Sequence, residues 1–236
     1  MIDDSELRDL DAFAIYDAEA HRLDGFFATL AGDDWLRDTR CQGWRRREVL
    51  AHLAASERYN HATLDGSVPA LMEEAGKQGV TTIDAFNAYG VSERAERTPE
   101  ELLEEWRRED ADTRHRLREL GWDGALQTSV GPYPAGRQAF HLAMEYAVHA
   151  DDMGVPVADG ERRLRGTWQA RVARFTVREY GREVEVESDG AGGNVVRGAG
   201  AEVILDDEEL IDACTARLPE AAAVPQELRD RLRVFA

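Results

Sequence analysis

The sequence has few cysteines and no long apolar run, and each scarcity excludes a class of protein. Cys41 and Cys214 are the only cysteines and form no CxxC motif, which excludes a disulfide framework and a thiolate zinc knuckle. We expect Cys41 to be a buried structural residue rather than a reactive thiol. No stretch approaches the roughly 20 apolar residues of a membrane span, and the acidic N-terminus does not resemble a secretory signal. We therefore expect a cytoplasmic protein with no membrane partner.

Positive charge is also scarce. The chain has 29 lysines and arginines against 47 aspartates and glutamates, a net charge of −18. This argues against nucleic acid or an anionic membrane as a partner and favours an enzyme of small molecules. Lys77 is the only lysine, an arginine bias typical of a GC-rich bacterial genome. The composition carries no signal for the oligomeric state.

Apolar residues at steps of three and four predict a bundle of four main helices. Thr98, Pro99 and Glu101 form a capping box with proline at the first helical position, which predicts a helix start. Residues 66–79 and 121–136 are expected to be loops, the first with one short helical turn at most. The predicted helices cover residues 5–31, a segment that begins after Trp44, residues 83–96, residues 99–120 and a segment that ends near Met153.

The pattern changes after Pro156. Residues 161–180 are predicted to be helical, residues 182–188 and 202–205 to be strands with a glycine-rich turn between them, and a further helix follows. The expected fold class is thus mainly α, a four-helix bundle over residues 1–156 followed by a small α/β domain over residues 157–236.

The stretch RQAFHLAMEYAVHADD places His141, Glu145 and His149 four residues apart on one predicted helix. Their side chains fall within an arc of about 80°, so they share one face. Imidazole nitrogens and a carboxylate oxygen suit a divalent ion, most plausibly zinc, and His52 on another helix is the candidate for a further ligand. Helical histidines more often have a surface or core role, which remains the alternative, but an unpaired Glu145 among apolar neighbours would be costly and this strengthens the case for a metal site.

Two motifs, CQGWRRREVLAHLAASE and EYAVHADDM, resemble those of the DinB-like and mycothiol-dependent maleylpyruvate isomerase superfamily. The resemblance covers most of residues 5–155 and implies a DinB-like four-helix bundle with His52, Glu145 and His149 as metal ligands. His141 lies outside this triad, so it becomes a neighbour of the ligands, a substrate contact or a structural residue. Arg45 replaces the usual threonine or serine after the GW pair, which affects only the helix cap.

The resemblance also implies a function. Three protein ligands leave a position at which a metal can activate a thiol, and in actinobacteria, the usual home of this family, that thiol would be mycothiol. We expect a mycothiol-dependent enzyme that isomerises a cis-unsaturated acid. A mycothiol S-transferase acting on an electrophilic metabolite or xenobiotic, a metal-dependent hydrolase and a structural metal protein remain alternatives.

Four further residues are candidates near the site. Asp151 and Asp152 follow His149 closely enough to accept a hydrogen bond from a ligand ring or to hold an arginine. Arg137 near the start of the metal-face helix, and Arg217 in the C-terminal part, are candidates to bind a substrate carboxylate within a strongly acidic protein.

Overall fold

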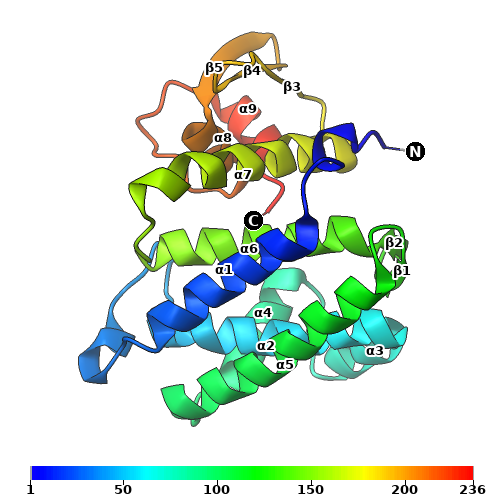
Figure 1. Ribbon diagram of the computed structural model, residues 1–236, viewed down its shortest axis with the longest axis vertical. Helices are drawn as coiled ribbons and strands as arrows, with labels where there is room; N and C mark the ends of the chain where they lie inside the picture. Colours follow the sequence, from blue (N-terminus) through cyan, green and yellow to red (C-terminus); the bar gives the residue numbers. More distant parts are fainter. Residues whose placement is uncertain (1, 236) are drawn as a thin grey trace. The chain divides into compact units, whose positions relative to one another are not determined.

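The computed structural model describes residues 2–235, which form two compact units (Figure 1). One unit contains residues 12–155, and the other joins residues 2–11 to residues 156–235. The first is a helical bundle and the second combines helices with a three-stranded sheet. The predicted fold class is therefore confirmed.

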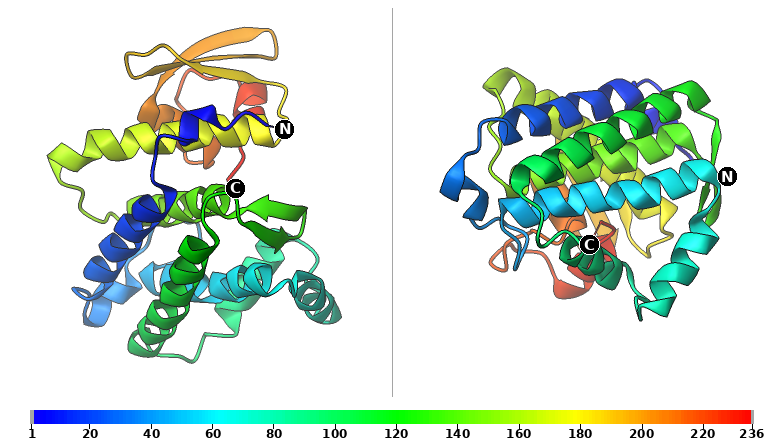
Figure 2. Two further views of the ribbon diagram at one scale, coloured as in Figure 1. Left: turned by 45° about the vertical axis from the view of Figure 1, so that its right-hand side comes forward. Right: turned by 90° about the horizontal axis from the view of Figure 1, so that it is seen from below.

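Four long helices build the bundle, in which α1 packs along α6 and α2 packs along α5 (Figure 2). Their aromatic side chains fill its core: the ring of Trp106 lies 5.7 Å from both Phe27 and Tyr146, measured between centroids. The four helices are α1 (Ala12–Phe27), α2 (Arg46–Asp65), α5 (Pro99–Leu120) and α6 (Ala135–Asp152).

The capping box at the start of α5 is confirmed. The Thr98 backbone N–H donates to Glu101 Oε2 at 2.8 Å, and the Glu101 N–H donates to Thr98 Oγ1 at 3.3 Å. The predicted first helix is interrupted, because a 3₁₀ turn, η1 (Ser5–Leu7), precedes α1. Asp9 and Asp11 fall in the break, and aspartate favours caps over helix interiors.

Both expected loops of the bundle contain regular structure. Residues 66–79 include helix α3 (Val68–Lys77), whose Val68, Leu71 and Ala75 are buried at helical spacing. Residues 121–136 include a hairpin of β1 (Ala125–Thr128) and β2 (Gly131–Pro134). Its prolines hid the strand signal, although a two-stranded hairpin accepts proline where no ladder N–H is needed. The remaining elements of this unit are η2 (Gly32–Leu36) and α4 (Ile83–Ser92).

The second unit holds an antiparallel sheet in the order β3, β4, β5. Its middle strand was expected to belong to a glycine-rich turn, and helix α9 was not predicted. The middle strand is stabilised by polar contacts that sequence patterns do not show: Asn194 is fully buried and accepts a hydrogen bond from Arg174 Nη1 at 2.6 Å. The elements are α7 (Asp159–Glu179), β3 (Glu185–Ser188), β4 (Gly193–Gly198), β5 (Ala201–Asp206), α8 (Asp207–Cys214) and α9 (Gln226–Leu232).

Ion pairs attach the N-terminal residues to this second unit. Glu6 pairs with Arg174 at 2.8 Å and with Arg178 at 2.7 Å, and Asp9 pairs with Arg171. Within residues 2–235, no helix has both the length and the apolar character needed to cross a membrane.

Candidate metal centre

Three donor side chains from two helices converge inside the bundle: His52 of α2, and Glu145 and His149 of α6. One ligand atom from each lies within 4.8 Å of the other two. His52 Nε2 is 2.9 Å from Glu145 Oε1, and the two imidazole centroids are 5.1 Å apart. Both histidines are buried, whereas Glu145 keeps 32% of its side chain exposed. The three predicted ligands therefore meet, and part of the Glu145 side chain remains exposed to solvent.

The turn before α2 holds His52 in place. The Trp44 ring centroid lies 4.9 Å from that of His52, so the tryptophan of the GW pair packs directly against this histidine. His52 Nδ1 is buried and has no hydrogen-bond partner within residues 2–235. A buried polar atom without a partner is rare in folded proteins and is consistent with a site completed by a group from outside the chain.

The cluster sets the charge of its own members. Burial acts to raise the pKa of Glu145, but the hydrogen bond from His52 and the charges of His52 and His149 outweigh it, so this pKa is lowered. Burial lowers the pKa of His149 and outweighs the opposing hydrogen bond to Asp152. An ionised carboxylate and a neutral imidazole are the forms that bind a metal, so the donor set fits a divalent cation.

Asp152 contacts the cluster directly. Its Oδ2 lies 3.2 Å from His149 Nδ1, an arrangement that fixes the ring orientation of a ligating histidine. Asp151 is half-buried and belongs to neither group of metal-capable side chains found in residues 2–235. His141 also lies outside these groups, and its Nε2 is 2.9 Å from the hydroxyl of Tyr133 in strand β2.

The two candidate arginines lie in different units. Arg137 is a buried residue of the first turn of α6, one turn before His141. Arg217 follows α8 in the other unit, where its guanidinium donates to the carbonyl of Thr215 at 2.5 Å. Their predicted role in anion binding stays a prediction.

Cys41 is the residue that the sequence reasoning missed. It is half-buried rather than buried, and its Sγ lies 3.0 Å from Asp152 Oδ2 and 3.6 Å from His149 Nδ1. The only signal was its place in the CQGW motif just before α2. Helical periodicity could not reveal the contact, because Cys41 lies in a loop and its neighbours lie 108 and 111 residues later.

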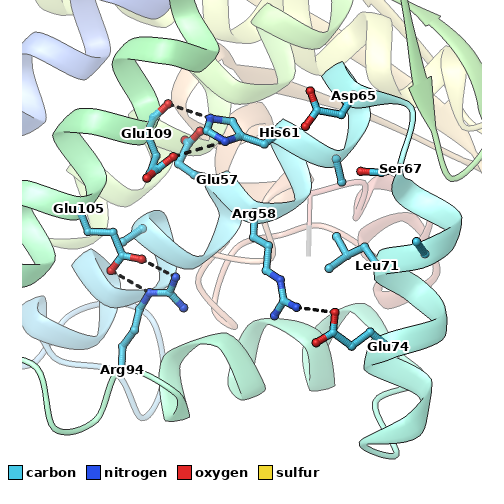
Figure 3. Close-up of a pocket in the computed structure, with 13 residues that line it drawn as sticks. Glu57, Arg58, His61, Asp65, Ser67, Leu71, Glu74, Arg94, Glu105 and Glu109 are labelled. Carbon is cyan, nitrogen blue, oxygen red and sulfur yellow. Dashed lines mark hydrogen bonds and ion pairs between the residues drawn. The ribbon is translucent and has the colours of Figure 1, made fainter.

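A separate pocket of about 490 Å³ lies between α2, α3 and α5 (Figure 3). None of its lining residues belongs to the metal-capable cluster. Its basic groups pair with acids of the same pocket: Arg58 with Glu74 at 2.9 Å, and Arg94 with Glu105 at 2.7 Å. These pairs offset the charges that could bind an ionic ligand, so the metal-capable cluster remains the candidate site.

Comparisons with known proteins agree with the fold of the helical unit. A family profile described as the mycothiol maleylpyruvate isomerase N-terminal domain matches residues 16–154. Two solved structures, a mycothiol-dependent maleylpyruvate isomerase and a mutant of it with a histidine replaced by alanine, are each 16% identical to this chain. Each likeness covers 73% of this chain and 70% of the other, with TM-scores of 0.50 and 0.51 respectively, and shows a shared fold. Among proteins of curated function, none matches the sequence.

Proposed function

The chain belongs to the mycothiol maleylpyruvate isomerase N-terminal domain family, and from this we propose that it is a mycothiol-dependent metalloenzyme that isomerises a cis-unsaturated acid. The observation that supports the proposal most strongly is the convergence of His52, Glu145 and His149. These residues would hold the metal, and their donor types favour zinc. Because the chain supplies only three ligands in this group, a small molecule could also reach the metal.

When bound, the metal would supply Lewis acidity, which lowers the pKa of an entering thiol. The thiolate then adds to one carbon of the conjugated double bond, and the electron pair moves onto the adjacent carbonyl. Rotation about the new single bond and loss of the thiolate restore the double bond as the trans isomer. The thiol is recovered, so the reaction needs no oxidant or reductant.

Residues of the chain would orient this site. Asp152 accepts the N–H of His149 Nδ1 and so keeps the other ring nitrogen available as a ligand. Asp151 and His141 stay candidates for a supporting role beside the ligands.

A carboxylate substrate also needs a positive partner, since the chain carries a net charge of −18. Arg137, in the first turn of the metal-face helix, is our first candidate, and Arg217 is the second. Arg137→Ala and Arg217→Ala should each raise KM for an anionic substrate without changing metal content. Unchanged KM in both variants would favour a neutral electrophile and hence a mycothiol S-transferase.

The decisive experiment combines metal analysis with turnover of maleylpyruvate in the presence and absence of mycothiol. We expect turnover that requires both mycothiol and metal, and a loss of about a hundredfold or more in His52→Ala. His61→Ala is the matched control, because His61 lies on the same helix but pairs with Glu109 at 3.4 Å. Turnover with water alone would identify a hydrolase, a product that keeps the thiol would identify a transferase, and bound metal without turnover would identify a structural site.

A further inference from the structure

A second group of metal-capable side chains adjoins the first. Cys41, Asp152 and His149 each offer one ligand atom within 4.8 Å of the others. Within this group the thiol sulfur is 3.0 Å from Asp152 Oδ2 and 3.6 Å from His149 Nδ1, and those two atoms are 3.2 Å apart. Only His149 belongs to both groups, so the second has two donors of its own.

The backbone holds Cys41 against the end of α6. The Arg40 N–H donates to the Asp152 carbonyl at 3.1 Å, and Arg46 Nη2 donates to the Met153 carbonyl at 3.1 Å. The Cys41 N–H donates to Thr39 Oγ1 at 3.1 Å, which fixes the loop itself. The position of the thiol thus follows from a backbone hydrogen bond before it and a side-chain hydrogen bond after it, both accepted by carbonyls at the end of α6.

The separations suit a metal. Zinc binds sulfur at about 2.3 Å and nitrogen or oxygen at about 2.0–2.2 Å, so tetrahedral ligand atoms lie about 3.3–3.7 Å apart. The observed 3.6 Å lies within that range, and the 3.2 Å and 3.0 Å distances fall short of it by no more than a few tenths of an ångström. We propose that Cys41, Asp152 and His149 Nδ1 form a second metal site, which takes a thiophilic divalent cation such as zinc, cobalt or cadmium. On binding, the thiol releases its proton to solvent and the sulfur–metal bond replaces the S–H bond.

The second site is inferred from its own donors and does not require the proposed reaction, but it shares His149 with the first site. A neutral imidazole has one nitrogen lone pair available as a ligand, so the two groups compete for His149. When His52 is absent, the first group loses a ligand while the second keeps all three. A cation held by the chain then rests on Cys41, Asp152 and His149.

Cobalt(II) provides the test, because a cobalt–thiolate bond gives a sulfur-to-metal charge-transfer absorption in the near ultraviolet. His52→Ala and the double variant His52→Ala/Cys41→Ser are titrated with cobalt(II) in buffer without added thiol. We expect the sulfur absorption in the single variant, and its loss in the double variant together with cobalt binding at least about tenfold weaker. Serine can still donate a hydrogen bond to Asp152, which makes the substitution conservative.

Two controls keep the result interpretable. Glu145→Gln weakens the first group while leaving both histidines, so it should show the same sulfur absorption if His52→Ala fails to fold. The other cysteine, Cys214, is fully buried in the other unit, and the double variant retains it. Absence of the sulfur absorption in folded His52→Ala at saturating cobalt, or equal cobalt affinity with and without Cys41, would overturn the proposal. If the unaltered protein shows no mycothiol-dependent turnover, the proposed function is refuted, but the proposed second metal site is not.

Discussion

Two glutamates on neighbouring helices of the bundle, Glu145 and Glu57, have carboxyl groups that respond to their surroundings in opposite ways. The pKa of Glu145 is lowered: burial acts to raise it, but the hydrogen bond from His52 and the charges of His52 and His149 together outweigh burial. Burial and the nearby Asp110 raise the pKa of Glu57 to about 8. The first glutamate keeps a third of its side chain in solvent, whereas the second is almost completely buried. Two residues of the same type therefore differ in pKa because Glu145 has histidines as neighbours, whereas Glu57 has a second acid as its neighbour.

Hydrogen bonds around Tyr146 lead to the same conclusion for Glu57. The Tyr146 hydroxyl lies 3.0 Å from Glu57 Oε1, 3.0 Å from Asp110 Oδ1 and 2.9 Å from the Trp106 indole nitrogen. A phenol has one hydrogen to donate, so one carboxyl must donate its own. Burial raises the pKa of Asp110, but Arg114 pairs with this carboxyl at 2.8 Å and opposes that rise, so the proton is favoured on Glu57, which has no such cationic partner among the described residues that shift its pKa. The cluster around Tyr146 satisfies its polar groups among themselves inside the bundle, whereas the cluster of His52, Glu145 and His149 keeps ligand atoms that a metal could bind.

The largest expected effect is that of removing His149, because this residue belongs to both metal-capable groups. His149→Ala should lower metal affinity by about a hundredfold or more, with metal content measured by elemental analysis after dialysis. His141→Ala is the matched control on the same helix, since His141 hydrogen-bonds to Tyr133 instead. Full metal content in His149→Ala would place the metal elsewhere.

The second prediction concerns Glu57 and the pH dependence of stability. Its folded pKa of about 8 exceeds the ordinary 4.5, so the folded state binds one more proton than the unfolded state between these pH values. The free energy of unfolding should therefore fall as pH rises through this window, by about 1.4 kcal/mol per pH unit from this group. Glu57→Gln should remove this slope in urea denaturation.

The control for that experiment is Glu104→Gln, which alters an exposed position of α5. This variant should show the same dependence of the free energy of unfolding on pH as the unaltered protein. A slope that persists unchanged in Glu57→Gln would mean that Glu57 is ionised in the folded protein, which contradicts the proton count around Tyr146.

The third prediction separates the two clusters at adjacent residues of one helix. Tyr146→Phe removes the hydroxyl shared by Glu57, Asp110 and Trp106, so it should destabilise the protein by about 1–3 kcal/mol. Metal content should not change, although Tyr146 follows Glu145 directly. Loss of metal in a folded Tyr146→Phe protein would show that the clusters are coupled through α6.

The difference between the clusters also shows what the sequence could predict. His52, Glu145 and His149 were identified because two of them share a helix face and all three match a family motif. Glu57 and Asp110 carry no such signal: Asp110 lies within a run of charged residues on α5, most of which face solvent. Asp110 is the acid of this run that points inward, because it contacts Tyr146 and Arg114, and these contacts exist only in the folded bundle.

The same limit explains the errors in the fold. Helix α5 was predicted because its cap is encoded within four residues, Thr98 to Glu101. Strand β4 was missed because its stability depends on Asn194, which bonds to Arg174 twenty residues earlier. Cys41 was misjudged for the same reason, since its partners lie at the far end of the bundle sequence. Local signals were predictable, and contacts between distant segments were not.

The smallest expected effect is the pH dependence from Glu145, because solvent screens a side chain that is 32% exposed. Its folded pKa lies below 4.5, so it contributes stability at neutral pH that is lost as pH falls through the folded pKa. In metal-free protein, Glu145→Gln should thus be less stable than the unaltered chain at neutral pH and approach it in acid, opposite in sign to Glu57→Gln. His52→Ala should abolish this difference, because the hydrogen bond from His52 is the main cause of the lowered pKa. Urea denaturation of the unaltered chain, Glu145→Gln, His52→Ala and the double variant at several pH values measures the coupling between Glu145 and His52. If the effect of Glu145→Gln on stability persists without His52, the lowered pKa of Glu145 is due to His149 instead.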